Sequence, residues 1–463
     1  MGRKLLATGF ALLLTVALGG TAAASTTPAG PRLENPHPCP AQPGFTCSTL
    51  TVPLDHTGRV PGTLDLQVAT ADNVTAPKGV LLFLVGGPGQ GGVSHIKDLA
   101  VGKLPEVAKD HRFVMLDQRG TGEFGALRCP GLQTQMGSSN IATPTREAVA
   151  ECANLLGDRA PLYSTDQTVA DLDLLRQALG VRKMVVDGVS YGSFTAARYA
   201  IAHPRNVRKL VLDSVLPHHA TSADSLYLVG LRANARVLRD ACAAPPACGY
   251  DPAEDLAQVV RQRGVADGVR IFDAMVTYEF FDPTYRDPRG DIIGAVHAAR
   301  GGDPTRLNKL LEKLAGANRA APADYSSGLQ AGTLCADMRF PWGSASTPAE
   351  VRQARLDRTE ARLPEQATWP YTSQVAVTQG FIQLCLPWPA EHASSNPAGH
   401  LPDVPTLLLN GDRDLSTPLE WAEREADVAP RGELVVVKGE SHSIQNRERG
   451  HAGREAVIKF LAG

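Results

Sequence analysis

A single serine, Ser190, lies between two glycines in the pentapeptide Gly188–Val189–Ser190–Tyr191–Gly192. An apolar run, Met184–Val186, precedes this stretch, and a helix-like pattern follows it. A serine on a sharp strand-to-helix turn has a strained backbone and a projecting hydroxyl, and glycines two residues away prevent clashes with it. The pattern therefore predicts a nucleophilic serine rather than a structural glycine-rich turn.

A serine hydroxyl attacks a carbonyl efficiently only when a base removes its proton, and a histidine held by a carboxylate is the expected base. In doubly wound sheets that carry this chemistry, the residues follow in the order serine, acid, histidine. Among the twelve histidines, His442 has the right place, in a loop after the strand-like run Glu433–Lys438. We therefore predict that His442 is the base.

The acid is expected in the loop after the preceding strand-like run, Pro405–Asn410, where Asp412 and Asp414 both lie. Asp414 is farther into the loop and close to a Thr-Pro turn, so we favour Asp414 as the carboxylate that orients His442. Asp412 would then be a turn residue near the strand end. Both loops follow the carboxyl ends of strands, at the sheet edge where the serine is also expected.

Negative charge develops on the carbonyl oxygen during such an attack, and backbone N–H groups stabilise it. One donor is expected to be the N–H of Tyr191, directly after the serine and near the positive end of the next helix. The second is expected in the glycine-rich loop after the apolar run Val80–Val85, and we assign it to Gly86 or Gly87. A phosphate-binding loop is disfavoured because the GxxxxGK[ST] spacing is absent.

The strands and helices that would position these residues can be read from the sequence. Strand-like runs alternate with helical patterns before residue 217 and after residue 401. Several runs are continuously apolar, which is typical of strands covered on both faces, so the alternation predicts a mostly parallel sheet flanked by helices. The segment between these parts has helical patterns and few strand signals. We predict an α/β core of residues 47–216 and 402–463, with a mainly helical cap, 217–401, inserted.

The N-terminus has the features of a secretory signal, residues 1–24. Arg3 and Lys4 precede the apolar run Leu5–Leu18, and small residues at 22–24 offer a cleavage site. The run is shorter than the about 20 residues that a membrane span needs. We therefore expect a secreted protein without a membrane span, beginning with an extended lead-in, residues 25–46.

Eight cysteines, an even number in a chain expected to be exported, indicate disulfide bonds. The sequence does not choose among the pairings, and nearest-neighbour pairing would give 39–47, 129–152, 242–248 and 335–385. There is no CxxC or HExxH motif, so we expect neither a metal nor another cofactor. The net charge of -2 argues against a nucleic-acid partner.

Five features carry a family resemblance: GGPG at 86–89, DQRGTG at 117–122, GVSYG at 188–192, the aspartate-x-x-Thr-Pro of 414–418, and His442. Together they resemble the proline iminopeptidase-related α/β-hydrolases, and especially the secreted bacterial tripeptidyl aminopeptidases. The resemblance extends from about residue 39 to the end. It implies an α/β-hydrolase fold, a triad of Ser190, Asp414 and His442, and cleavage of short peptides from a free N-terminus through an acyl-enzyme without a cofactor.

An enzyme that acts on free N-termini must recognise an ammonium group, which calls for carboxylates or carbonyls that face the pocket. Glu279 and Asp337 in the predicted cap are our candidates, with Asp282 as a third. Each of them could instead be a solvent-facing charge. An exported carboxylesterase or lipase is the alternative function, because ester and amide cleavage use the same triad.

Overall fold

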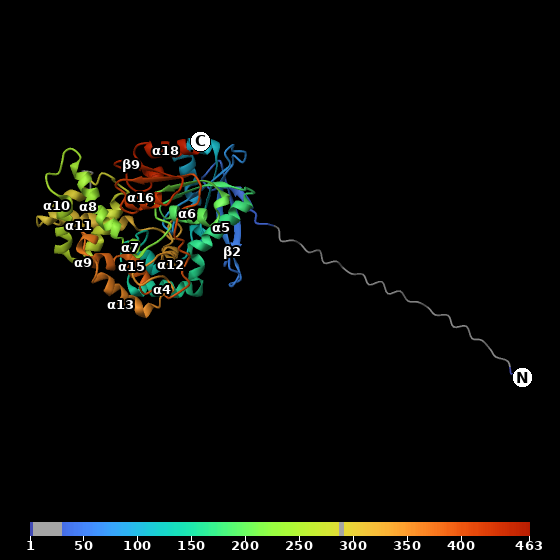
Figure 1. Ribbon diagram of the computed structural model, residues 1–463, viewed down its shortest axis with the longest axis horizontal. Coiled ribbons are helices and arrows are strands. Elements are labelled where there is room, and N and C mark those ends of the chain that lie inside the picture. The colour runs from blue at the N-terminus through green and yellow to red at the C-terminus, as the bar shows by residue number, and fades with distance from the viewer. Residues whose placement is uncertain (3–29, 287–290) are drawn as a thin grey trace. The chain divides into compact units, whose positions relative to one another are not determined.

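Nine strands form one sheet in the computed structural model, which describes residues 1–2, 30–286 and 291–463. The strand order is β1-β2-β3-β5-β4-β6-β7-β8-β9 (Figure 1). The strands are β1 (Glu34–Pro38), β2 (Phe45–Pro53), β3 (Thr63–Ala71), β4 (Val80–Leu84), β5 (Arg112–Leu116), β6 (Met184–Val189), β7 (Val207–Asp213), β8 (Thr406–Gly411) and β9 (Gly432–Val437). Apart from its first two residues, the predicted signal segment 1–24 lies outside the described residues.

The six strands from β5 to β9 in the sheet order are parallel, whereas β1, β2 and β3 are joined to the sheet by antiparallel pairing. The predicted mostly parallel sheet is confirmed. The sequence analysis did not reveal β1, which pairs with β2 at the sheet edge. Its residues, ENPHP, are mostly exposed, so no apolar run marks this strand.

Alternate residues of the central strands face two different layers of helices. In β4, Leu82 and Leu84 belong to one apolar core, and Leu81 and Phe83 belong to the other. Burial on both faces explains why this strand is continuously apolar. The first core includes residues of α5 (Thr165–Ala178), α6 (Tyr191–Ala202) and α16 (Leu419–Asp427), and the second includes residues of α1 (Pro105–Asp110) and α18 (Ala452–Ala462).

The segment between β7 and β8 is largely helical, and α8 to α11 lie together in Figure 1. Its helices are α7 (Ser222–Ser225), α8 (Leu228–Ala243), α9 (Pro252–Tyr278), α10 (Ile292–Arg300), α11 (Thr305–Ala317), α12 (Ser327–Asp337), α13 (Ala349–Glu360), α14 (Ser373–Thr378) and α15 (Gly380–Cys385). All of them except α7 contribute to a large apolar core that also includes Phe194 of α6 and Trp421 of α16. This inserted segment, called the cap below, therefore packs directly on the elements around Ser190.

Four further helices complete the α-helical elements of the described residues: α2 (Gly122–Gly125), α3 (Pro130–Gln135), α4 (Arg146–Leu156) and α17 (Ile444–Arg447). Four disulfide bonds join Cys39 to Cys47, Cys129 to Cys152, Cys242 to Cys248, and Cys335 to Cys385. The nearest-neighbour pairing is thereby confirmed. Over the part of the chain that is described, no helix combines the length and the apolarity required to cross a bilayer.

Candidate active site

Ser190 lies at the sharp turn between β6 and α6, with the backbone angles φ 59° and ψ -127°. A positive φ is strained for a serine, and such strain is typical of a nucleophile on this kind of turn. A Cβ atom on Gly188 would lie 2.2 Å from the Gly192 carbonyl oxygen, and one on Gly192 would lie 2.3 Å from the Leu84 carbonyl oxygen. The two glycines are therefore required by the close approach of backbone on both sides of the serine.

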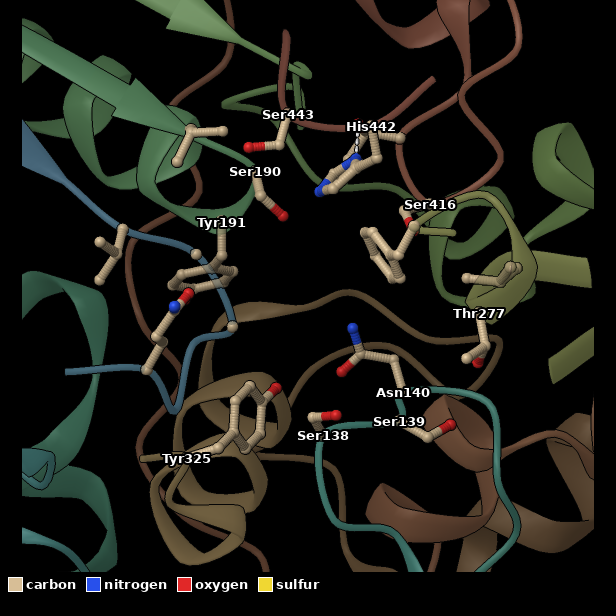
Figure 2. Close-up of a pocket in the computed structure, with 18 of the residues that line it drawn as sticks. Ser138, Ser139, Asn140, Ser190, Tyr191, Thr277, Tyr325, Ser416, His442 and Ser443 are labelled. Carbon is tan, nitrogen blue, oxygen red and sulfur yellow. Dashed lines mark hydrogen bonds between the residues drawn. The ribbon is translucent and has the colours of Figure 1, made fainter. Parts of the chain in front are cut away.

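His442 and Asp414 form a buried pair in the loops after β9 and β8. His442 Nδ1 lies 2.9 Å from Asp414 Oδ2. Asp414 also accepts hydrogen bonds from Thr417, at 2.7 Å from the backbone N–H and 2.8 Å from the hydroxyl. Figure 2 shows the Ser190 hydroxyl pointing toward the His442 ring. The structure thus brings the three residues predicted from the sequence to one edge of the sheet.

Asp412, the competing aspartate of the acid loop, has other partners. Its Oδ1 accepts a hydrogen bond from the Gly439 N–H at 2.7 Å, and its Oδ2 lies 3.6 Å from Lys438 Nζ. These contacts join the loops after β8 and β9 near their starts. Asp412 therefore has the turn position expected of it, and Asp414 is the aspartate that contacts the imidazole.

Opposing influences act on the protonation of His442. Burial lowers the pKa of His442, whereas the Asp414 carboxylate and, to a smaller extent, Glu279 and Asp213 raise it, and the net pKa lies above the ordinary value of 6.5. The raised pKa makes the imidazole a stronger base toward a hydroxyl proton.

The loop after β4 approaches the nucleophile closely. A Cβ atom on Gly86 would lie 2.8 Å from Ser190 Cβ and 3.1 Å from Ser190 Oγ. Gly87 has a φ of 118°, a conformation that side chains disfavour. Tyr191 follows Ser190 as the first residue of α6. The backbones of Gly86 and Tyr191 therefore lie directly beside the serine, and Gly87 follows Gly86, at the place where the predicted oxyanion donors are expected.

A cavity of about 620 Å³ opens beside Ser190 and His442, and both residues line it together with Gly86, Gly87 and Tyr191. Figure 2 shows Ser138, Ser139 and Asn140 across the cavity from Ser190, with Tyr325 beside them. We call this wall the distal wall. Its residues come from the loop after α3 and from the segment just before α12, so the cap and the core both contribute to the cavity.

The structure contradicts the prediction that Glu279 and Asp337 face the cavity. Neither residue lines it, and both side chains are buried. Glu279 Oε2 accepts a hydrogen bond from the Leu415 N–H at 2.6 Å, and Asp337 Oδ2 accepts one from the Thr165 hydroxyl at 2.6 Å. Asp337 also accepts a hydrogen bond from the Tyr191 hydroxyl. Their carboxylates are thus directed toward groups of the protein.

Asp282, the third candidate, is also outside the cavity lining. Its Oδ1 accepts hydrogen bonds from the Thr284 hydroxyl at 2.6 Å and from Arg449 Nη2 at 3.0 Å. No sequence pattern distinguishes these three carboxylates from others, because the direction of a side chain depends on packing.

Asp273 is a carboxylate of the cavity lining that the sequence analysis missed. It lies in α9, is half-buried, and accepts a hydrogen bond from the Ser139 hydroxyl at 2.6 Å. Burial raises the pKa of Asp273 to about 6. Over the described residues, its hydrogen-bond partners are neutral and it forms no ion pair. No local motif marks Asp273, so only the packing of α9 could identify it.

Two neutral groups of the distal wall are available to a ligand. Gln330 Nε2 donates to the Ser139 carbonyl at 3.0 Å and to Asn140 Oδ1 at 2.5 Å, which leaves the Asn140 NH₂ group for the cavity, as Figure 2 shows. The Tyr325 hydroxyl is buried without a hydrogen-bond partner among the described residues. Buried polar groups ordinarily have partners, so both groups fit a polar ligand.

Glu279, Asp414 and His442 each have one atom within 4.8 Å of the others, a spacing that could also suit a metal ion. Protein donors already reach these carboxylates, from Leu415 and Ser416 to Glu279 and from Thr417 to Asp414. The imidazole also contacts Asp414 directly. The three groups thus lie close together, and each carboxylate already accepts hydrogen bonds from groups of the protein.

The sheet, the strained serine and the buried histidine–aspartate pair define an α/β-hydrolase. Residues 79–248 match the family described as alpha/beta hydrolase fold, and residues 370–463 match the family described as TAP-like protein. The chain is 30% identical over 364 residues to a proline iminopeptidase of Neisseria meningitidis, with 78% of this chain and 83% of that protein covered. It belongs to the proline iminopeptidase-related family of α/β-hydrolases.

Two other relatives are similar to this chain. The serine protease Hip1 of Mycobacterium tuberculosis is 26% identical over 455 residues, with 87% of this chain and 82% of that protein covered. A tripeptidyl aminopeptidase of Streptomyces coelicolor is 30% identical over 188 residues, with 37% of this chain covered. The match to the Streptomyces protein spans 35% of that protein's length.

Proposed function

We propose that this chain is a serine peptidase that releases short peptides from free N-termini. Ser190 attacks the scissile carbonyl, His442 takes the hydroxyl proton and then gives it to the leaving amine, and Asp414 orients the imidazole. The N–H groups of Tyr191 and of Gly86 or Gly87 stabilise the oxyanion. Water then releases the acyl group from Ser190 by the same steps in reverse.

The observation that carries the preference for a free N-terminus is the half-buried Asp273 carboxylate, which lines the cavity and accepts a hydrogen bond from Ser139 of the distal wall. A partly desolvated carboxylate binds a cation strongly, and the ammonium of a peptide is a cation that also donates hydrogen bonds. Asp273 replaces Glu279 and Asp337 in this role.

The same wall favours a peptide over a lipid ester. A fatty acyl chain would cover the Asp273 carboxylate and the Asn140 amide with methylene groups, and both polar groups would lose their hydrogen bonds to water without replacement. A peptide instead supplies an ammonium for the carboxylate and carbonyl groups for the two neutral donors. The esterase alternative therefore requires unsatisfied polar groups that the peptidase does not.

We also propose that the protein is exported. Four disulfide bonds within the described residues favour an oxidising compartment, and the predicted signal segment 1–24 would direct the chain there. The first cysteine of the bonded set, Cys39, follows the predicted cleavage site by 15 residues. The mature chain would therefore keep all four bonds.

A panel of peptidyl p-nitroanilides with one to four residues, each with a free and an acetylated N-terminus, tests the proposal. We expect the highest kcat/KM for free di- or tripeptides, because a cavity of about 620 Å³ is in the usual range for small ligands. Acetylation should lower kcat/KM strongly. Equal cleavage of the acetylated series, or turnover of p-nitrophenyl esters without any peptide turnover, would contradict it.

A further inference from the structure

Glu279 connects the cap to the loop that carries Asp414. It follows α9 directly, and only 1% of its surface is exposed. Its carboxylate accepts hydrogen bonds from the Leu415 N–H at 2.6 Å and the Ser416 N–H at 3.0 Å, and a third from the Ser416 hydroxyl. Leu415 and Ser416 immediately follow Asp414, so the carboxylate of a cap residue fixes the backbone of the acid loop.

The same carboxylate lies beside the imidazole. One oxygen of Glu279, one oxygen of Asp414 and one nitrogen of His442 lie within 4.8 Å of one another. Phe280, the next residue of the cap, packs edge-on against the His442 ring, with 5.5 Å between the ring centroids. Two consecutive cap residues therefore contact the acid loop and the base.

We propose that Glu279 is a positioning residue of the triad, a second carboxylate that holds the Asp414 loop and directs negative charge toward His442. This inference rests on the proposed role of the triad. It gives the cap a part in catalysis, because a cap displaced from the core would remove both the loop's anchor and this charge. It also explains why a carboxylate is buried at a position that does not face the substrate cavity.

The chemistry follows from the charges on the three groups. When His442 takes the Ser190 proton, it becomes an imidazolium, and an ionised Glu279 stabilises that cation together with Asp414. Burial and the Asp414 charge raise the pKa of Glu279 to about 8. Because each group influences the proton affinity of the other, Glu279 and His442 titrate as a pair. The active form has a neutral imidazole and an ionised Glu279.

Other groups near this pair contribute to the same titration. Asp213 raises the pKa of His442, and its carboxylate accepts hydrogen bonds from the N–H groups of Ile444 and Gln445. Arg447, Tyr227 and Tyr285 also interact electrostatically with Glu279 or Asp414, and Arg413 and Asp282 interact with Tyr285. Substitution of Glu279 alone leaves all of them unchanged, so it isolates the contribution of this carboxylate.

The test measures how fast a fluorophosphonate labels Ser190 as a function of pH, because this reaction needs the triad but no peptide recognition. In Glu279→Gln, the midpoint of the acid limb should move to lower pH by about half a unit or more. The acid limb of the variant should also follow the titration of one proton, because Glu279 no longer titrates together with His442. Glu279→Asp keeps the charge, so its midpoint should stay near that of the wild type even if its rate falls.

Glu425→Gln is the matched control, because Glu425 is a buried glutamate whose carboxylate contacts His218 at 2.7 Å rather than the triad. Its midpoint should not move. A uniform rate loss in Glu279→Gln at an unchanged midpoint would overturn the inference, as would a higher KM confined to peptides with free N-termini. If Glu279→Gln does not fold, a one-proton acid limb in the wild type would overturn it. Absence of labelling in the wild type would instead contradict the proposed function.

Discussion

His442 Nδ1 lies 2.9 Å from Asp414 Oδ2, and both side chains are almost fully buried. An ionised carboxylate can only accept hydrogen bonds, so this contact requires a proton on Nδ1. Nε2 of the neutral imidazole then has no proton and can accept the proton of the serine. The Thr417 hydroxyl and N–H hold the same carboxylate in place. The pair therefore fixes both the tautomer and the orientation that a base for Ser190 needs.

Replacing Asp414 with Asn should lower kcat by about 10³- to 10⁴-fold, because an amide can favour the wrong imidazole tautomer. Steady-state kinetics with a free dipeptidyl nitroanilide would measure the loss. Asp412→Asn is the control from the same loop, since Asp412 contacts Gly439 and Lys438 instead of His442. Comparable losses in both variants would contradict the assignment of Asp414.

Replacing Ser190 with Ala should lower kcat by about 10⁴-fold or more without unfolding the protein. The alanine removes only a hydroxyl, while the glycines at 188 and 192 keep the turn. Mass spectrometry of the fluorophosphonate-treated wild type should find the label on Ser190, and the variant should remain unlabelled. Labelling of another serine in both proteins would refute the role of Ser190.

The acid limb of kcat/KM should lie above pH 6.5, because the pKa of His442 is raised in the folded protein. Below that pKa the imidazole is protonated and cannot accept the serine proton, so activity falls as the pH falls. Initial rates between pH 5 and pH 9, corrected for reversible loss of structure, would measure the limb. A constant rate from pH 5 to pH 8 would argue against His442 as the base.

The positions of the proposed triad residues could be predicted from the sequence because each residue follows the end of a strand in a recognisable order. Gly188 and Gly192 mark the serine turn, and the late loops carry the acid and the base. The choice between Asp412 and Asp414 rested on the position in the loop, and the structure places Asp414 against the imidazole. Short motifs carry this information because the sheet brings strand ends to a common edge.

The cap could not be predicted to the same depth. The sequence from Ile292 to Ala315 has one helical pattern, whereas the structure has two helices there, α10 and α11. The segment 301–304 between them, Gly-Gly-Asp-Pro, favours a break. The directions of Glu279 and Asp273 depend on how α9 packs, and periodicity does not fix that packing. The polar edge strand β1 also lacked an apolar run, although its segment was expected to be extended.

The disulfide between Cys335 and Cys385 should contribute most to stability among those within the cap, because it closes a loop with a sequence separation of 50 residues. Chain entropy gives about 4 kcal/mol for a loop of this length and about 2 kcal/mol for one like Cys242–Cys248, whose separation is 6 residues. Urea unfolding of the two double Cys→Ala variants would compare these free energies. A larger loss for the 242–248 pair would contradict this ranking.

Asp273 provides the test of substrate choice. Asp273→Asn should lower kcat/KM for a free dipeptidyl nitroanilide by about 10- to 100-fold, because a hydrogen bond between charged groups contributes about 1.5–3 kcal/mol. The same substitution should leave the rate for the acetylated substrate nearly unchanged, since that substrate has no ammonium to lose. The ratio of the two kcat/KM values in each protein therefore measures recognition of the N-terminus.

Asp324→Asn is the matched control, because Asp324 also lines the cavity but is exposed to solvent. Water screens an exposed carboxylate, so this substitution should change the ratio less than twofold. If Asp324→Asn lowered the ratio as much as Asp273→Asn, the cavity would attract ammonium groups by its overall charge rather than through one carboxylate. An unchanged ratio in Asp273→Asn would show that this carboxylate does not recognise the N-terminus.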